Sequence, residues 1–215
     1  MSVRLSLGWV TGTMSGRATL ARMADSGIAP APEGGDEVDE RQLDAQDRAR
    51  RRVALAQIRQ YPDAVLRMRA REVELFDDDL ARLAEKMAHL MHDARGVGLA
   101  ATQVGVLQRM FVFQLADEDD VRTIVNPEIT KRSRSTDVAD EGCLSLQGVL
   151  VSVERAVEVT IEGQDVTGAP LKLELEEMDA RVVQHELDHL DGVLMLERTD
   201  DESRKDALAT LRRQL

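Results

Sequence analysis

The chain has 215 residues, of which 43% are hydrophobic, and this is enough for one domain of ordinary size with its own core. It has 40 acidic and 28 basic residues, and the formal net charge of −12 argues against a protein that wraps nucleic acid with its whole surface. Its single cysteine excludes an internal disulfide, and no apolar run is long enough to cross a membrane.

Residues 1–52 differ from the rest of the chain and are predicted to form a disordered extension of a folded domain at 53–215. Residues 28–37 combine proline, glycine and acidic residues without an apolar period, which is typical of a linker. Residues 1–23 contain arginines, serines and threonines but no acid, and this composition faintly resembles an organellar transit peptide. We favour a poorly ordered bacterial extension and a cytoplasmic protein, with an organellar location as the alternative.

The folded part is predicted to begin with a turn at 61–63, followed by an amphipathic helix. The helix has carboxylates at 77–79 that can cap its first turn, and an apolar stripe at helical spacing made by Leu80, Leu83, Met87, Leu90 and Met91. His89 and His92 lie three residues apart on this helix. No carboxylate or cysteine motif accompanies them, so we interpret them as structural or surface histidines.

The next segment, GVGLAATQVG at 96–105, is rich in small residues and contains one glutamine, Gln103. It lacks the third glycine of a dinucleotide-binding loop, and an amphipathic helix rather than a clear strand precedes it. The segment is therefore predicted to be a tight turn that brings backbone and the Gln103 amide to a ligand. A turn that serves packing alone is the alternative.

Strands follow at 109–115 and 123–126, and a hairpin is predicted from the alternation of apolar residues at 157–161 and 171–175 around a turn at 163–170. Leu208 and Leu211 suggest an amphipathic C-terminal helix after Asp200 and Asp201. The order of helix, strands and helix predicts an α+β fold rather than an alternating parallel one.

The run QHELDHLDG at 184–192 is the most informative feature of the sequence. His185 and His189 lie four residues apart, so on a helix they stand one turn above the other and can reach one metal ion. Glu186 is placed to hold or deprotonate a water on that metal. Asp179 is the expected N-cap of this helix and Gly192 its stop. We expect antiparallel strands to pack around this central metal-binding helix.

A catalytic metal site needs a third protein ligand, and Cys143 in the segment EGCLSL is the candidate. A lone cysteine is usually a small buried hydrophobe. One thiolate and two imidazoles, however, suit iron, zinc, nickel or cobalt rather than magnesium or calcium. Gly142 beside the cysteine lets the backbone approach closely.

Together these three segments resemble the peptide deformylase family, which carries GxGLAAxQ, EGCLS and QHExDHLxG in this order. The resemblance runs from about Ile58 to about Arg198. It implies a metal bound by Cys143, His185 and His189, with Glu186 as general acid and base. It also implies that the Gln103 amide and the Leu144 backbone N–H bind the developing oxyanion, and that Val97, Gly98 and Gly142 contact the substrate.

The activity that the resemblance implies is hydrolysis of the N-formyl group from the initiator methionine of new polypeptides, with release of formate. The implied native metal is Fe²⁺, with Zn²⁺, Ni²⁺ or Co²⁺ as substitutes. Nascent formyl-methionyl peptides are the expected partners, with transient ribosome contact but no membrane and no stable nucleic-acid complex. Two basic stretches could provide that contact, although charged solvated faces are the simpler interpretation: Arg48 with Arg50, Arg51 and Arg52, and Arg204 with Lys205, Arg212 and Arg213.

The sequence departs from the family pattern at positions outside the ligands and the base. Many members have a proline soon after the cysteine motif, where this chain has 146–148 as Leu-Gln-Gly, and some have an arginine where Leu150 stands. Met178 and Asp179 replace two large apolar residues ahead of the metal helix. These changes put contacts with the substrate peptide in doubt more than the chemistry.

Two rival functions stay open at this stage. The first is a general HExxH endopeptidase, whose third ligand would come from downstream acids at 197–202, because no histidine follows His189. The second is a non-catalytic protein in which the metal only stabilises the fold. Whether Cys143 is essential distinguishes the first rival from the deformylase.

Overall fold

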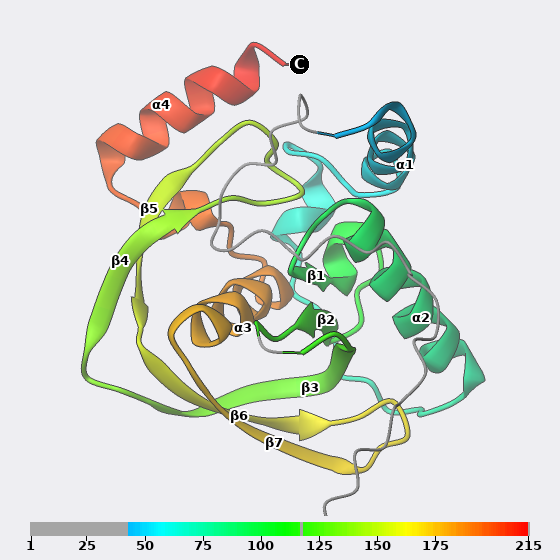
Figure 1. Ribbon diagram of the computed structural model, residues 1–215. Helices are drawn as coiled ribbons and strands as arrows, with labels where there is room; N and C mark the ends of the chain where they lie inside the picture. Colours follow the sequence, from blue (N-terminus) through cyan, green and yellow to red (C-terminus); the bar gives the residue numbers. More distant parts are fainter. Residues whose placement is uncertain (1–42, 117, 215) are drawn as a thin grey trace, which may run out of the picture. The chain divides into compact units, whose positions relative to one another are not determined.

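The computed structural model describes residues 43–116 and 118–214, which fall within one unit of the chain. Its elements follow one another as the labels in Figure 1 show. The helices are α1 (Ala45–Leu55), α2 (Asp78–Asp93), α3 (Glu177–Leu190) and α4 (Asp201–Arg212), with 3-10 turns η2 (Ala64–Arg67), η3 (Ala101–Val104) and η4 (Met195–Glu197). The strands are β1 (Gly98–Ala100), β2 (Met110–Gln114), β3 (Val121–Arg132), β4 (Thr136–Glu141), β5 (Val151–Ala156), β6 (Glu158–Gln164) and β7 (Pro170–Glu176).

The strands form two antiparallel sheets, which confirms the predicted α+β class. One sheet has the order β1-β2-β3-β6-β7, and the other pairs β4 with β5. A single residue, Val157, separates β5 from β6, and a short turn at 133–135 joins β3 to β4. The chain therefore passes from one sheet to the other and back, and the ribbon curves around α3 (Figure 1).

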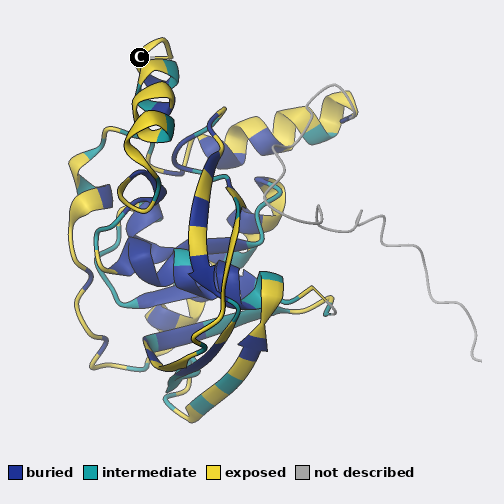
Figure 2. Cartoon of the chain, turned by 90° about the vertical axis from the view of Figure 1, so that its left-hand side faces the viewer, coloured by how far each residue is buried: buried dark blue, intermediate teal, exposed yellow. Residues whose placement is uncertain are grey.

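Helix α3 lies at the centre of this arrangement, because it contacts strands of both sheets as well as η3. Most of its residues from Ala180 to Leu190 are buried. Its apolar side chains, among them Val183, Leu187 and Leu190, pack with Phe111, Phe113 and Ile161 of the larger sheet. The helix that carries HELDH is thus held on all sides, whereas α4 at the C-terminal end is largely exposed (Figure 2).

The predicted helix and hairpin are found with small changes of boundary. Asp77 caps α2 by accepting hydrogen bonds from the backbone N–H groups of Asp79 and Leu80, and the apolar stripe of α2 is buried. β6 and β7 pair from Glu158 with Glu176 to Gln164 with Pro170. Strand β3 is longer than the expected 123–126, and β1, β4 and β5 have no counterpart among the predicted strands. Among the described helices, none has both the length and the apolar character needed to span a membrane.

The expected start of α3 at Asp179 is wrong. The helix begins at Glu177, and the carboxylate of Asp179 instead accepts a hydrogen bond from the backbone N–H of Ala116, 3.1 Å away. The Asp179 side chain therefore makes a tertiary contact with Ala116 instead of capping the helix. The expected stop is right, because Gly192 adopts a φ of 74° just after the helix, a conformation that glycine reaches without strain.

The expected boundary between extension and domain at residues 52 and 53 falls inside α1, so the chain is already helical from Ala45. Asp44 caps this helix, while Ala54 and Leu55 are buried in a cluster with residues of α2. Helix α1 has few apolar residues between its arginines, so its sequence shows no clear helical period of apolar residues. Packing against α2 rather than local pattern stabilises it. The rest of that prediction, for residues 1–42, lies outside the described residues.

Removing residues 1–42 is expected to leave the melting temperature nearly unchanged, whereas removing 1–56 should lower it by several degrees. The longer deletion takes away buried Leu55, whose burial is worth roughly 1.5–3 kcal/mol. In a domain of this size, 1 kcal/mol corresponds to about 2–4 °C. Thermal unfolding of the two truncated proteins side by side checks this, and equal melting temperatures would show that α1 contributes nothing to stability.

Candidate metal centre

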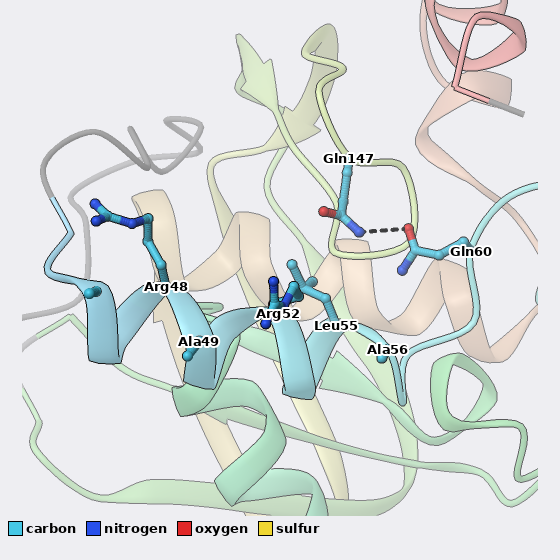
Figure 3. A pocket seen from close by; sticks show the side chains of 8 residues that line it. Arg48, Ala49, Arg52, Leu55, Ala56, Gln60 and Gln147 are labelled. Carbon is cyan, nitrogen blue, oxygen red and sulfur yellow. Dashed lines mark hydrogen bonds between the residues drawn. The ribbon is translucent and has the colours of Figure 1, made fainter.

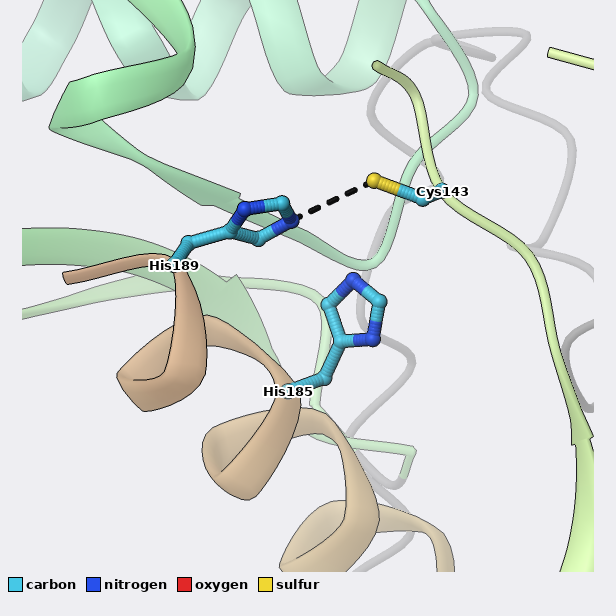
Figure 4. A group of neighbouring side chains, drawn as sticks. All are labelled: Cys143, His185 and His189. Atoms are coloured by element: carbon cyan, nitrogen blue, oxygen red, sulfur yellow. Dashed lines mark hydrogen bonds between the residues drawn. The ribbon is translucent and has the colours of Figure 1, made fainter. Parts of the chain in front are cut away.

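The structure brings Cys143, His185 and His189 together, although they come from two distant parts of the chain. The histidines lie one turn apart on α3, and Cys143 follows β4. One ligand atom from each of the three residues lies within 4.8 Å of the others. The Sγ of Cys143 is 3.2 Å from Nε2 of His189, and the ring of His185 faces the same space (Figure 4).

Glu141, the last residue of β4, orients His185. Its Oε2 lies 2.9 Å from Nδ1 of His185, which leaves Nε2 of that ring for a ligand. Burial alone would raise the pKa of Glu141, but hydrogen bonds from Arg155 and His185 lower it well below its ordinary value, so the carboxylate is charged. Burial disfavours the charged ring of His185, yet the hydrogen bonds to Cys143 and Glu141 raise its pKa. The pocket around His185 therefore favours a positive charge.

A buried network of ion pairs surrounds Glu141. Arg155 on β5 donates two hydrogen bonds of 2.9 Å to Glu141 and one of 2.6 Å to Asp188 on α3. Arg181 donates a further bond of 3.0 Å to Glu141, and Arg198 holds Asp188 through two bonds of 3.0 and 2.6 Å. The network joins β4, β5, α3 and the segment after η4 around the metal ligands.

The sequence motifs do not reveal these supporting residues, although strand β5 carries one signal of them. Val151, Val153 and Arg155 alternate along β5, so their side chains share one face of the strand, and the two valines are buried. An arginine on the apolar face of a strand needs a buried acid as its partner. Glu141 and Asp188 both lie inside the recognised motifs, but nothing in their spacing shows that one arginine binds both.

The carboxyl group of Glu186 lies against the backbone of β1 at Gly98. Burial raises the pKa of its carboxyl to about 7. Among the described residues its Oε2 is buried without a hydrogen-bond partner. A β-carbon added at Gly98 would lie 2.8 Å from the carboxyl carbon of Glu186, so the glycine makes room for this side chain. A buried, unpartnered carboxyl oxygen beside three ligand atoms is suited to hold a water.

The amide of Gln103 is fixed at both ends. Its Oε1 accepts a 2.8 Å hydrogen bond from the backbone N–H of Ala100, and its Nε2 donates to Oγ of Ser145 and faces the Cys143 sulfur at 3.7 Å. These contacts set the orientation of the amide, with its N–H groups towards the cysteine. The turn that carries Cys143 is held in turn by Gln60, whose Nε2 donates to the carbonyl of Leu144 at 3.0 Å.

The three residues expected to contact substrate lie in or next to this region. Val97 and Gly98 are at the start of β1, where the carbonyl of Val97 accepts a hydrogen bond from Gln114 and Gly98 pairs with Phe113. Gly142 is half-buried between β4 and Cys143. Their contact with substrate stays a prediction. His89 and His92 are exposed on α2, away from the three-ligand group.

The donor set fits a transition metal with three protein ligands. A thiolate and two imidazoles suit iron, zinc, nickel or cobalt, and three ligands leave a position open for water or substrate. Burial lowers the pKa of His189 well below its ordinary value, which favours the neutral ring that a metal ion needs. The unpartnered Oε2 of Glu186 adds a group that could hold a water at the open position.

Comparisons with known proteins agree with these motifs. The model of the family "Polypeptide deformylase" matches residues 55–205 of the chain. The chain is 45% identical over 141 residues to "Peptide deformylase" of Thermotoga neapolitana, covering 66% of this chain and 85% of that protein. It is 43% identical over 141 residues to "Peptide deformylase 1B, chloroplastic" of Oryza sativa subsp. japonica, covering 64% of this chain and 52% of that protein.

A solved structure shows the same likeness in three dimensions. The crystal structure of a peptide deformylase from Legionella pneumophila superposes with a TM-score of 0.69 at 39% sequence identity. The match covers 73% of this chain and 92% of that one. The likeness therefore extends over most of the chain rather than the motifs alone.

Replacing Gly98 with alanine is expected to remove nearly all hydrolysis of a formyl-methionyl peptide while the bound metal remains. The new β-carbon would displace the buried carboxyl group of Glu186, and none of its three nearest atoms belongs to a proposed metal ligand. Activity and metal content of the purified variant provide the measurement.

Gly96→Ala is the matched control, because its β-carbon would lie 2.7 Å from the end of the Leu144 side chain and none of its three nearest atoms belongs to Glu186. We expect it to lose much less activity than Gly98→Ala. Equal losses of activity in the two variants would show that displacement of Glu186 does not cause the loss in Gly98→Ala.

Proposed function

We propose that Glu186 is the general acid and base in the reaction of this chain, which belongs to the polypeptide deformylase family. The enzyme removes the N-formyl group from the N-terminal methionine of newly made polypeptides and releases formate. The observation that carries the proposal is the meeting of one sulfur and two imidazoles beside a buried carboxyl group, one oxygen of which has no hydrogen-bond partner among the described residues.

Cys143, His185 and His189 would hold the metal, and we propose Fe²⁺ as the native ion with Zn²⁺, Ni²⁺ or Co²⁺ as substitutes. When bound, the metal polarises the formyl carbonyl and lowers the pKa of a water molecule. Glu141 supports this assignment, because its hydrogen bond to Nδ1 of His185 fixes which ring nitrogen faces the other ligands.

Glu186 takes a proton from the attacking water and later delivers it to the leaving nitrogen of methionine. The C–N bond of the formamide breaks, so that one water and one formyl peptide give formate and a free amine. A pKa near 7, raised by burial, allows the same carboxyl group to accept and donate a proton near neutral pH. The close approach of Gly98 supports the proposal, because it holds the carboxyl group in one place.

The Gln103 amide and the backbone N–H of Leu144 would donate hydrogen bonds to the oxyanion that forms as water adds to the carbonyl. Each such donor is worth on the order of 10²–10³ in rate when it is held in place before the reaction. Gln103 is held in this way, since its carbonyl oxygen is bound by Ala100. The hydrogen bond from Gln60 to the Leu144 carbonyl restrains the following peptide of the same turn rather than the peptide that carries the Leu144 N–H.

Neither rival function fits the contacts as well. Two of the four acids that the endopeptidase reading offers at 197–202 are engaged elsewhere: Glu197 binds Arg67 and the backbone of Leu194, and Asp200 caps α4. A site that only stabilises the fold has no use for a buried carboxyl oxygen without a partner, which is unfavourable in a protein interior. Both observations favour a catalytic centre with Cys143 as a ligand.

The enzyme is expected to work in the compartment where formyl-methionyl polypeptides are made. We propose the bacterial cytoplasm, or an organelle if residues 1–23 act as a transit peptide. Transient contact with the ribosome belongs to this proposal, through exposed arginines of α1 or through Arg212 and Arg213 at the end of the chain.

Glu186→Gln is expected to keep the metal and to lower kcat by at least about 10²-fold, since it keeps the size of the side chain and removes the base. Glu186→Ala should behave in the same way. Metal analysis and a formyl-methionyl peptide assay on protein purified without air make the test. Loss of metal in step with activity in both variants would assign Glu186 to the ligands instead.

Cys143→Ala is expected to lower metal content and activity together, because two imidazoles alone hold a transition metal weakly in an open site. His92→Ala, at an exposed histidine of α2, is the control and should change neither quantity. If Cys143→Ala retained full activity, the deformylase mechanism proposed here would fail and the endopeptidase reading would regain support.

A further inference from the structure

Helix α2 ends in a backbone conformation that is unusual for the residue that adopts it. Arg95 has a φ of 59°, in the left-handed region where glycine is the usual residue. Its N–H donates to the carbonyl of His92, and the N–H of Gly96 donates to the carbonyl of Met91, both at 2.9 Å. This pair of hydrogen bonds is the Schellman motif, with arginine at the position that glycine normally takes. The turn is therefore strained at Arg95, because a β-carbon disfavours this conformation.

The glycines directly after this turn lie against two groups that are proposed to act in the reaction. A β-carbon on Gly96 would lie 2.7 Å from the side chain of Leu144, whose N–H is a proposed oxyanion donor. A β-carbon on Gly98 would lie 2.8 Å from the carboxyl carbon of Glu186. Since both glycines follow Arg95 within three residues, the direction in which the chain leaves α2 determines where they lie.

The guanidinium of Arg95 is bound by α1. It donates a 2.6 Å hydrogen bond to Oδ2 of Asp47, and the two side chains are only 25% and 34% exposed, so water screens the ion pair in part. Asp47 lies in the first turn of α1, where its N–H donates to the cap residue Asp44 and its negative charge suits the helix dipole. The ion pair thus links Arg95 to a helix that ends where the match to the family model begins.

The residues that follow α1 contact the other end of the same stretch, 95–103. The backbone N–H of Arg59 donates to the carbonyl of Gln103 at 2.7 Å. The next residue, Gln60, accepts a 3.0 Å hydrogen bond from Gln147 in the turn after the cysteine ligand (Figure 3). Helix α1 and its C-terminal extension therefore hold this stretch at its first and last residues.

We propose that Asp47 and Arg95 are positioning residues for the reaction, and that through them α1 fixes the start of the stretch that lies against the base. This inference rests on the proposed function, because it takes Glu186 as that base. The ion pair offsets the unfavourable φ of Arg95 and keeps the turn closed. Without the pair, the strained turn opens part of the time and Gly98 moves relative to Glu186. Such a displacement lowers the rate although neither positioning residue touches the substrate.

The test compares Arg95→Ala with Arg95→Gly in the full-length, metal-loaded enzyme. Both changes remove the ion pair, but glycine reaches this φ without strain and alanine does not. We expect Arg95→Ala to lower kcat/KM for a formyl-methionyl peptide about fivefold or more, and Arg95→Gly to stay within about twofold of the wild type. Asp47→Asn should lower it about two- to fivefold, the range of a partly exposed ion pair, and should have no further effect when combined with Arg95→Gly.

Hydrogen exchange gives a second readout that does not depend on turnover. The amide of Gly96 is protected only while the turn is closed, because it donates to a carbonyl of α2. Its exchange should be faster in Arg95→Ala and Asp47→Asn, and close to that of the wild type in Arg95→Gly. Asp79→Asn is the control and should change neither readout, since it breaks an exposed ion pair with Arg82 near the other end of α2.

Three outcomes would overturn the inference. Equal losses of kcat/KM in Arg95→Ala and Arg95→Gly would show that the side chain itself is needed rather than the conformation of the turn. Wild-type kcat/KM in Arg95→Ala and Asp47→Asn would show that the pair only fastens α1 to the domain. Loss of kcat/KM without faster exchange at Gly96 would show that the turn does not open. Turnover of the peptide by the wild type tests the proposed function separately, and the exchange data test the ion pair whether or not turnover is found.

Discussion

The carboxylate of Glu141 is the group on which the rest of the centre depends. It is only 4% exposed, yet it stays charged because Arg155, Arg181 and His185 all donate to it. A buried charge of this kind is tolerated only when its partners are complete, and loss of one partner typically costs several kcal/mol. The interaction that fixes the ring of His185 is therefore the one that joins β4 and β5 to α3. Stability of the fold and geometry of the metal centre cannot be changed independently at this position.

The two-stranded sheet provides the register that this network needs. Glu141 pairs with Val151 at one end of the sheet, and Asp137 pairs with Arg155 at the other. A slip of one residue would turn Arg155 to the outer face and leave Glu141 and Asp188 without their shared partner. The buried valines at 151 and 153 oppose such a slip, because it would expose them. The apolar alternation of β5 thus protects the charged network at its end.

Sequence alone predicted the α+β class, the helix α2 with its cap, the hairpin of β6 and β7 and the residues that meet in the metal centre. These features are encoded locally, by period, by capping residues or by motifs with fixed spacing. It did not predict α1, β4 or β5. Helix α1 depends on packing of Ala54 and Leu55 against another helix, and β4 is an exposed edge with charged residues on both faces. The sequence also did not predict that Gly98 makes room for the Glu186 side chain. That contact joins two segments far apart in the chain, so no local pattern reveals it.

The wide separation of the ligands has a consequence for how the metal is acquired during biosynthesis. Cys143 and His189 are 46 residues apart, and Asp188 needs Arg198 beyond the end of α3. An isolated helix of 14 residues is only marginally stable in water, so the histidine pair alone presents no lasting chelate while the chain is being made. Contacts of such long range form late in folding. If Cys143, His185 and His189 hold the metal as proposed, the folded protein rather than the growing chain would bind the ion, and the geometry of the fold would govern which ion is retained.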